Sequence, residues 1–283
     1  MKKVLIISKM QFETWISDRR MIALIVLVFF VDRQVTSGLC ENAAVLGEKL
    51  CILEPFIATA GSMWLQIVIP VIYIVLMYDY PSRYGSKIFY IIRSGRDKWY
   101  YGQMVFASVG AFVYTVVLFF ITVVLNLKYV ELKNSWSVPV TMAYSVAGVE
   151  NNAAANLIKP STFFQGTPLM VFSYNFVFLF FNLLLVNMLQ LTLFSWNIRK
   201  YTSLLCIGLE TVGAVTAFIT KWLRWAFPTA NAVFSLHFEN YISAPKYPVI
   251  CSILYFMGSV LLLWITGLIG ISHAKLADRM EDS

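Results

Sequence analysis

The sequence predicts an all-α integral membrane protein with six transmembrane helices, an N-terminal interfacial helix and both ends in the cytoplasm. Of its 283 residues, 59% are apolar and 13% are charged, and the mean hydropathy is +0.71. Several continuous apolar runs approach the ~20 residues that a helix needs to cross the hydrocarbon core. Because these runs do not alternate polar and apolar residues, they indicate helices and not the strands of a barrel. We therefore expect residues 1–283 to form one multi-pass domain in the cell membrane.

The N-terminal segment, residues 1–20, mixes five Lys or Arg residues with apolar side chains. This composition is typical of a helix that lies at the membrane interface. The first span is predicted at 21–39, although its continuous apolar run ends at Val31 and the charged residues Asp32 and Arg33 follow. We expect these two side chains to face protein, water or each other, because charge is costly against lipid.

Five more apolar stretches complete the predicted set. The second span, 61–78, contains Pro70, where a kink is expected. The others are 100–127, 169–196, 201–220 and 249–271. The third and fourth spans are long enough to be tilted or to project beyond the bilayer. The connections predicted on the outer side are 40–60, 128–167 and 221–248.

The distribution of basic residues supports this orientation. The segments assigned to the cytoplasm hold 14 of the 22 Lys and Arg residues, and the outer segments, with the first one counted from Asp32, hold 8 over a greater length. Membrane proteins place an excess of Lys and Arg on the cytoplasmic side. The net charge of +7 therefore reflects topology. It does not indicate nucleic-acid binding, because the basic residues are spread over short loops.

A basic cytoplasmic loop is predicted at 79–99, between the second and third spans. Its apolar residues Ile88, Ile91 and Ile92 are flanked by four basic residues: Arg83, Lys87, Arg93 and Arg96. An apolar patch with a charged rim is typical of a surface that fills a groove on a partner protein. The alternative is an ordinary positive loop that only sets the topology.

The loop also contains a series of short motifs. It has Gly85-Ser86, then Ile91-Ile92, then Ser94-Gly95-Arg96 and Lys98-Trp99, and Gly102-Gln103 opens the next span. This order resembles the membrane subunit of ABC-2 type transporters, whose second cytoplasmic segment has Gly-Thr, two leucines, Ser-Arg and Gly-Lys in turn. In that family an acidic residue stands beside the first glycine. Here the nearest is Asp79, six residues earlier.

The resemblance implies a function and a set of partners. The second cytoplasmic segment would be a coupling helix that docks on a separate ATP-binding cassette subunit through Arg83, Gly85, Lys87, Ile88, Ile91, Ile92, Arg93 and Arg96. Two permease subunits, identical or different, would form an export pathway in a bacterial inner membrane. A short helical excursion on the outer face, at 222–248, would join the last two spans.

Nucleotide chemistry is expected in the partner and not in this chain. The phosphate-binding pattern of Gly, four residues, Gly, Lys and then Ser or Thr is absent. We therefore expect no enzyme activity and no cofactor in this chain, with ATP and magnesium bound by the ATPase subunit.

Polar residues inside the spans are candidates for a substrate path or for helix interfaces. Glu210 lies near the centre of the fifth span, where a carboxyl group should be protonated, paired or facing a polar cavity. Asn175 and Asn182 are seven residues apart and share one face of the fourth span. Hydrogen bonding between helices is the alternative role for these amides.

Cysteine and histidine positions are less informative. Cys40 and Cys51 share the first outer connection and leave a disulfide open, whereas Cys206 and Cys251 lie in apolar runs. His237 has no metal-ligand spacing around it, so no metal site is expected.

Two other classes of function remain open. An ion-gradient-driven secondary transporter would need several intramembrane carboxylates or broken helices. A non-transporting membrane immunity or scaffold protein would need no ATPase. An intramembrane enzyme is disfavoured because neither His-Glu-x-x-His nor Gly-x-Ser-x-Gly occurs. For an exporter, the cargo is open among drugs, antimicrobial peptides, lipids and polysaccharides.

Overall fold

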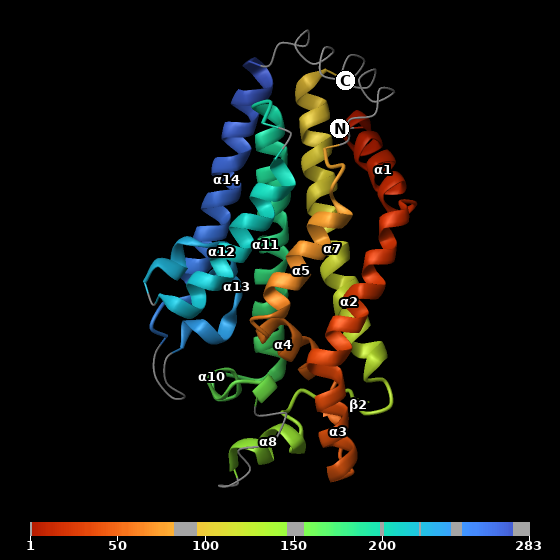
Figure 1. The fold of residues 1–283 in the computed structure, drawn as a ribbon, viewed down its shortest axis with the longest axis vertical. Helices are drawn as coiled ribbons and strands as arrows, with labels where there is room; N and C mark the ends of the chain where they lie inside the picture. Colours follow the sequence, from red (N-terminus) through yellow and green to blue (C-terminus); the bar gives the residue numbers. More distant parts are fainter. Residues whose placement is uncertain are drawn as a thin grey trace.

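The computed structural model describes residues 2–81, 95–145, 156–198, 201–220, 222–238 and 245–273. These residues form a bundle of helices and one two-stranded parallel sheet (Figure 1). Five helical runs are long and apolar enough to cross a membrane, and a sixth crossing results if one bent pair counts as a single span. The predicted all-α, multi-pass membrane architecture is confirmed at this level.

The first crossing is one helical run from Arg19 to Leu46, which extends beyond the predicted end at residue 39. It comprises η1 (Arg19–Ile22), α2 (Ala23–Val31), η2 (Asp32–Thr36) and α3 (Ser37–Leu46). The run ends at Gly47, whose φ of 66° is the left-handed conformation that glycine favours at a helix end.

Asp32 and Arg33 fall in the π-helical turn η2. Asp32 is half-buried, whereas Arg33 is exposed on the surface of the bundle. No ion pair joins them in the part of the chain that the structure describes. The alternative in which these two charges neutralise each other is therefore not observed.

The N-terminal helix α1 (Lys2–Ile16) packs against the first part of α7 (Arg96–Leu125). Trp15 meets Phe106 edge to face, with ring centroids 6.1 Å apart. The side of α1 away from α7 exposes Leu5 and Ile6. The starts of α1 and α7 and the end of α14 (Val249–His273) lie at one end of the bundle (Figure 1). A chain whose first helix begins and whose last helix ends at the same end of the bundle must cross it an even number of times, as six spans do.

The second predicted span, 61–78, corresponds to α5 (Leu65–Leu76). A further helix, α4 (Glu54–Gly61), precedes it and is bent by 88° relative to it. The bend lies between them, where Ser62 has an extended ψ of 117°, and α5 continues through Pro70. The sharp turn is therefore not at the expected proline. Residues Glu54 to Ala60, assigned to an outer loop, are buried against α7 and α11 (Pro168–Ser195). Their apolar side chains explain why this segment enters the bundle.

The remaining long helices are close to the predicted spans. They are α7, α11, α12 (Thr202–Ile219) and α14. The centre of the bundle is α11, which packs against α4, α7, α12 and α14. Half of the residues in the most apolar 18-residue stretch of α11 are buried inside the protein, the largest share among the five long runs. Hence α11 is the core helix, and its polar residues must find partners inside the protein.

Short elements connect the long helices. Strand β1 (Leu50–Cys51) pairs in parallel with β2 (Val130–Glu131), with Leu50 opposite Val130. Two short helices follow: α8 (Val138–Ser145) and α10 (Pro160–Phe163). Between α12 and α14 lie η4 (Leu223–Ala226), α13 (Pro228–Ala232) and η5 (Phe234–His237). All five residues of α13 are buried, so this part of the excursion folds into the bundle, whereas η4 has no buried residue.

No disulfide joins the two outer cysteines. The Cys40 thiol donates to Asn126 Oδ1 at 3.2 Å, and the Cys51 thiol donates to the carbonyl oxygen of Lys133 at 2.9 Å. Each thiol thus has its own acceptor, and both cysteines are free.

The contact between α1 and α7 depends on a glycine. A Cβ at Gly102 would lie 2.8 Å from Ile7 Cγ2 and 3.3 Å from the Val4 carbonyl oxygen, whereas a Cβ at Gly258 would meet nothing within 4 Å. We expect Gly102→Ala to destabilise the protein by about 1 kcal/mol, because overpacking outweighs the helix propensity of alanine. Gly258→Ala in α14 is the matched control and should be neutral or stabilising. Thermal unfolding in detergent tests this, and equal midpoints for the two variants would contradict it.

Candidate functional site

Most of the predicted coupling surface falls in a segment that the structure does not describe. Arg83, Gly85, Lys87, Ile88, Ile91, Ile92 and Arg93 lie outside the described residues. Arg96, the eighth, begins α7, and its Nη1 lies 3.5 Å from the Ser272 carbonyl oxygen near the end of α14. Gly95 precedes it with a φ of 88°, a conformation that favours glycine. The coupling role of these residues stays a prediction.

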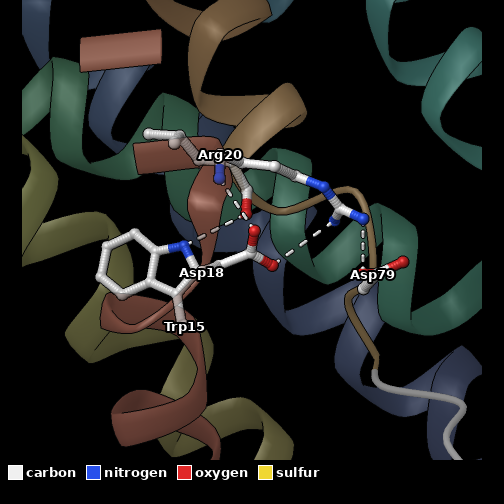
Figure 2. A network of polar contacts seen from close by, with 5 residues as sticks. Trp15, Asp18, Arg20 and Asp79 are labelled. Atoms are coloured by element: carbon white, nitrogen blue, oxygen red, sulfur yellow. Dashed lines mark hydrogen bonds and ion pairs between the residues drawn. The ribbon is translucent and has the colours of Figure 1, made fainter. Parts of the chain in front are cut away.

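The entry to that segment is held by a polar cluster between α1, η1 and the end of α5, which we call the α1–α5 joint (Figure 2). Trp15 Nε1 donates to the Leu76 carbonyl oxygen at 3.2 Å. Arg20 Nη2 lies 2.7 Å from Asp79 Oδ2. The Arg20 backbone N–H donates to Asp18 Oδ1 at 2.9 Å, which caps η1. The joint fixes the turn after α1 against the chain that leaves α5.

The joint also borders a cavity of about 370 Å³. Its lining combines the aromatic rings of Trp15 and Tyr80 with the charged side chains of Asp18, Arg20 and Asp79. Sequence reasoning missed this cluster because Arg20 and Asp79 are far apart in the chain and each is typical of an ordinary loop charge. The only available signal was their opposite charge at the ends of neighbouring spans.

Glu210 and Asn182 lie side by side in the structure, a pairing that was not predicted from the sequence. The Glu210 side chain is fully buried. Its Oε2 accepts hydrogen bonds from Thr229 Oγ1 at 3.0 Å and Asn182 Nδ2 at 3.4 Å. Its Oε1 has no hydrogen-bond partner among the described residues, and no described cation pairs with it. The cluster joins α11, α12 and α13, and sequence reasoning missed Thr229 because a threonine in a connection carries no special signal.

Asn175 is not part of this cluster. It is 1% exposed, and its Oδ1 has no partner among the residues that the structure describes. Further along α11, Asn187 Nδ2 donates to Tyr73 Oη at 2.5 Å and to the Ala107 carbonyl oxygen at 3.1 Å. Asn187 therefore ties α11 to α5 and α7. Two amides of the fourth span, Asn182 and Asn187, thus bond to neighbouring helices, whereas the Asn175 oxygen has no such partner among the described residues.

A second polar chain lies in the excursion between α12 and α14. His237 Nδ1 is 3.2 Å from the carbonyl oxygens of Val233 and Phe234, so this nitrogen carries the ring hydrogen. Ser252 Oγ is 2.8 Å from His237 Nε2 and 2.7 Å from Asn231 Oδ1, two acceptors for one hydroxyl hydrogen. These contacts join η5 to α13 and α14. His237 is thus a packed residue whose two ring nitrogens are both hydrogen-bonded. No group of side chains suited to binding a metal ion occurs among the described residues.

The surroundings of His237 keep its ring neutral. It stacks on Phe178 at 5.7 Å and lies 5.1 Å from Trp225. Burial lowers its pKa to about 4, the hydrogen bonds to the two carbonyl oxygens oppose this shift, and the nearby Arg224 cation adds to it. The excursion is therefore built around an uncharged imidazole.

No family model matches the chain, and no curated protein and no solved structure matches it. The sequence pattern and the geometry of the described residues are therefore the basis for any functional assignment.

Removing the Glu210 carboxyl should destabilise the protein. Glu210→Leu leaves the Asn182 amide without this acceptor, and an unsatisfied buried donor costs about 1–3 kcal/mol, whereas the Thr229 hydroxyl retains the backbone carbonyl oxygen of residue 210 at 3.2 Å. Glu210→Gln keeps an acceptor oxygen at the same place and should lose less. Thermal unfolding of both purified variants checks this order. A leucine variant as stable as the glutamine variant would show that these bonds do not contribute.

Stability should depend on pH through His237. Between pH 6.5 and about 4, the unfolded chain binds a proton at this ring that the folded protein does not bind. Stability should therefore fall as the pH decreases through this interval, by up to about 3 kcal/mol. The difference in unfolding midpoint between wild type and His237→Gln, followed from pH 8 to pH 4.5, isolates this contribution. A difference that does not change with pH would contradict it.

Proposed function

We propose that this chain is the membrane-spanning subunit of an ATP-driven ABC-2 type exporter. The order of elements supports the proposal: an N-terminal helix, a first span, a bent second span, and then long helices with a helical excursion before the last one. The buried helix α13 lies in the stretch where the resemblance to that family places the excursion. The motifs between Gly85 and Gly102 supply the specific part of the resemblance.

The single observation that carries the proposal is the position of α1. One part of α1 holds the end of α5 through Trp15, and the following turn holds Asp79 through Arg20. Another part packs on the start of α7, where Ile7 meets Gly102. Segment 82–94 thus leaves from and returns to two helices that are both braced by α1. A partner that pushes on this segment would move α1, α5 and α7 together.

The proposed mechanism follows from these contacts. ATP binding closes the ATPase subunits, which displace segment 82–94. The α1–α5 joint passes the displacement to α5, and α5 packs on α12, which carries Glu210. A second permease subunit completes the pathway, and ATP and magnesium are held by the ATPase. The chain itself hydrolyses nothing in this mechanism.

An ion-gradient-driven transporter is the second candidate, because the structure adds features that such a protein would use. Glu54 and Glu210 are both fully buried carboxyl groups. Helix α4 ends at an 88° bend, which makes the second span a broken helix. Intramembrane carboxylates and broken helices occur at the binding sites of secondary transporters. The two candidates differ in whether an ATPase is required.

Copurification tests the exporter proposal. The tagged protein is purified from its native membrane in mild detergent, and bound proteins are identified by mass spectrometry and ATPase assay. An ATP-binding cassette protein should copurify with wild type and should be reduced roughly tenfold or more by Ile91→Asp with Ile92→Asp, because two buried charges disrupt an apolar docking surface.

The matched control carries two aspartates at the other end of the bundle. Val45 and Leu132 are 85% and 84% exposed near the outer ends of α3 and β2. Val45→Asp with Leu132→Asp should retain the ATPase. If no ATPase accompanies wild type while other membrane complexes survive the same detergent, the exporter proposal is wrong and ion-driven transport is next in line.

A further inference from the structure

The cavity at the α1–α5 joint, called the joint cavity below, is large enough for a ligand and balanced in charge. Its volume of about 370 Å³ falls within the ~300–1,000 Å³ that small-molecule sites occupy. Part of its lining is aromatic, from Trp15 and Tyr80. Two acidic and two basic side chains also line it, namely Asp18, Arg19, Arg20 and Asp79. Such a lining suits a ligand that itself carries one positive and one negative charge.

The two carboxylates of the joint cavity share one cation (Figure 2). Arg20 Nη2 lies 2.7 Å from Asp79 Oδ2, and Arg20 Nη1 lies 3.9 Å from Asp18 Oδ2. No other described cation forms an ion pair with either carboxylate. Because one guanidinium group cannot neutralise two carboxylates, these three side chains together carry one excess negative charge. An ammonium group in the cavity would neutralise this charge and could donate several hydrogen bonds to the carboxylate oxygens.

Arg19 brings the complementary positive charge to the same cavity. The residue is exposed, and it forms no ion pair with any residue that the structure describes. A guanidinium group presents a planar set of donors that matches two oxygens of a phosphate group. A ligand in which a phosphate and an ammonium group are close together would therefore use both charges.

The surface that continues from the joint cavity distinguishes a lipid from a soluble ligand. Arg19 and Ile22 are the first and last residues of the 3₁₀ helix η1, in which residues three apart lie on the same side. Ile25 and Phe29 continue this side on α2, at spacings of three and four residues. The three apolar residues are 69%, 66% and 61% exposed. They form an apolar stripe along the first crossing, Arg19–Leu46, where acyl chains would cover it.

We propose that the joint cavity binds the headgroup of a phospholipid with a primary ammonium group, of the phosphatidylethanolamine type. The phosphate contacts Arg19, and the ammonium group contacts the carboxylates of Asp18 and Asp79. The acyl chains follow the apolar stripe. The lipid belongs to the leaflet at the Arg19 end of the first crossing, which the charge distribution assigns to the cytoplasmic side. The proposal does not depend on the transport assignment.

A bound headgroup would act on the α1–α5 joint itself. The joint is held by the Trp15 hydrogen bond to the Leu76 carbonyl oxygen and by the ion pair between Arg20 and Asp79. A ligand that contacts both Asp18 and Asp79 would add a further link between η1 and the chain that leaves α5. A ligand that binds only the folded state stabilises it, so the protein should be more stable with this lipid than without it.

The test uses the purified full-length protein, freed of native lipid in detergent, and short-chain lipids as probes. Dioctanoyl-phosphatidylethanolamine should raise the thermal unfolding midpoint in a saturable way. Three comparison ligands each lack one feature. Dioctanoyl-phosphatidylglycerol has no ammonium group, dioctanoyl-phosphatidylcholine has no N–H donor, and glycerophosphoethanolamine has no acyl chains. Each should bind roughly tenfold more weakly or less, as expected for the loss of about 1.4 kcal/mol or more.

Two variants assign the contacts. Arg19→Gln should weaken the apparent affinity for the ethanolamine lipid by roughly tenfold or more, because a charge-assisted contact is lost. The matched control is Arg33→Gln, since Arg33 is also exposed on the first crossing and is not among the described residues that line the joint cavity. It should keep the response. Asp18→Asn removes a charge but keeps the side-chain oxygen that caps η1, so it should fold and should reduce the preference for ethanolamine over glycerol lipid.

Four results would each overturn the proposal. Equal stabilisation by the ethanolamine and glycerol lipids would show a general attraction of anionic lipid to basic residues. Equal stabilisation by the choline lipid would remove the contact between N–H donors and the carboxylates. An equal affinity for glycerophosphoethanolamine would show that the apolar stripe binds no acyl chain. Equal responses of Arg19→Gln and Arg33→Gln would show that Arg19 does not hold the phosphate.

Discussion

Polar side chains inside a bilayer must be satisfied within the protein, because the hydrocarbon core offers no water. In this structure the constraint is concentrated in α11, which is both the central helix and the bearer of four buried amides: Asn175, Asn182, Asn187 and Gln190. Each helix packed on α11 is therefore either a source of hydrogen-bond partners or a neighbour that leaves an amide unsatisfied. Asn182 bonds to α12, and Asn187 bonds to α5 and α7, whereas neither polar side-chain atom of Gln190 has a partner among the described residues.

The two short helices α4 and α13 also carry buried polar groups whose partners lie inside the protein. Thr229 on α13 donates to Glu210, next to Asn182. At the start of α4, the Glu54 carboxylate accepts the backbone N–H of Cys51 at 3.0 Å and of Ser137 at 2.6 Å. Non-spanning backbone is tolerated at membrane depth only when it is enclosed by protein. Both helices are buried on all described residues or nearly so, and both pack on α11.

The long spans were predictable from sequence because their apolar runs are long enough to require burial in lipid. The span expected at 100–127, for example, corresponds to α7, Arg96–Leu125. The burial of α4 was not predictable: eight residues that begin with Glu54 and Pro55 are typical of a loop, and only the surfaces of α7 and α11 place them inside. Glu210 was identified because a carboxyl is costly in a span. Its partner Thr229 was not, because threonine costs little anywhere.

Movement at the inner end of the bundle would act differently on the two helices that α1 braces. Helix α7 is an unbroken run of 30 residues, about 45 Å long, so a displacement at Gly95 would reach β2 without a hinge. Helix α5 instead begins just after the 88° bend beside Ser62. Under the proposed function, a push shared by both helices would shift α7 as a rod and turn α4 about that bend. Gly61, the last residue of α4, lines a small cavity together with Asn175 of α11 and Ser235 of η5, so a turn of α4 about the bend would change the contact between these elements.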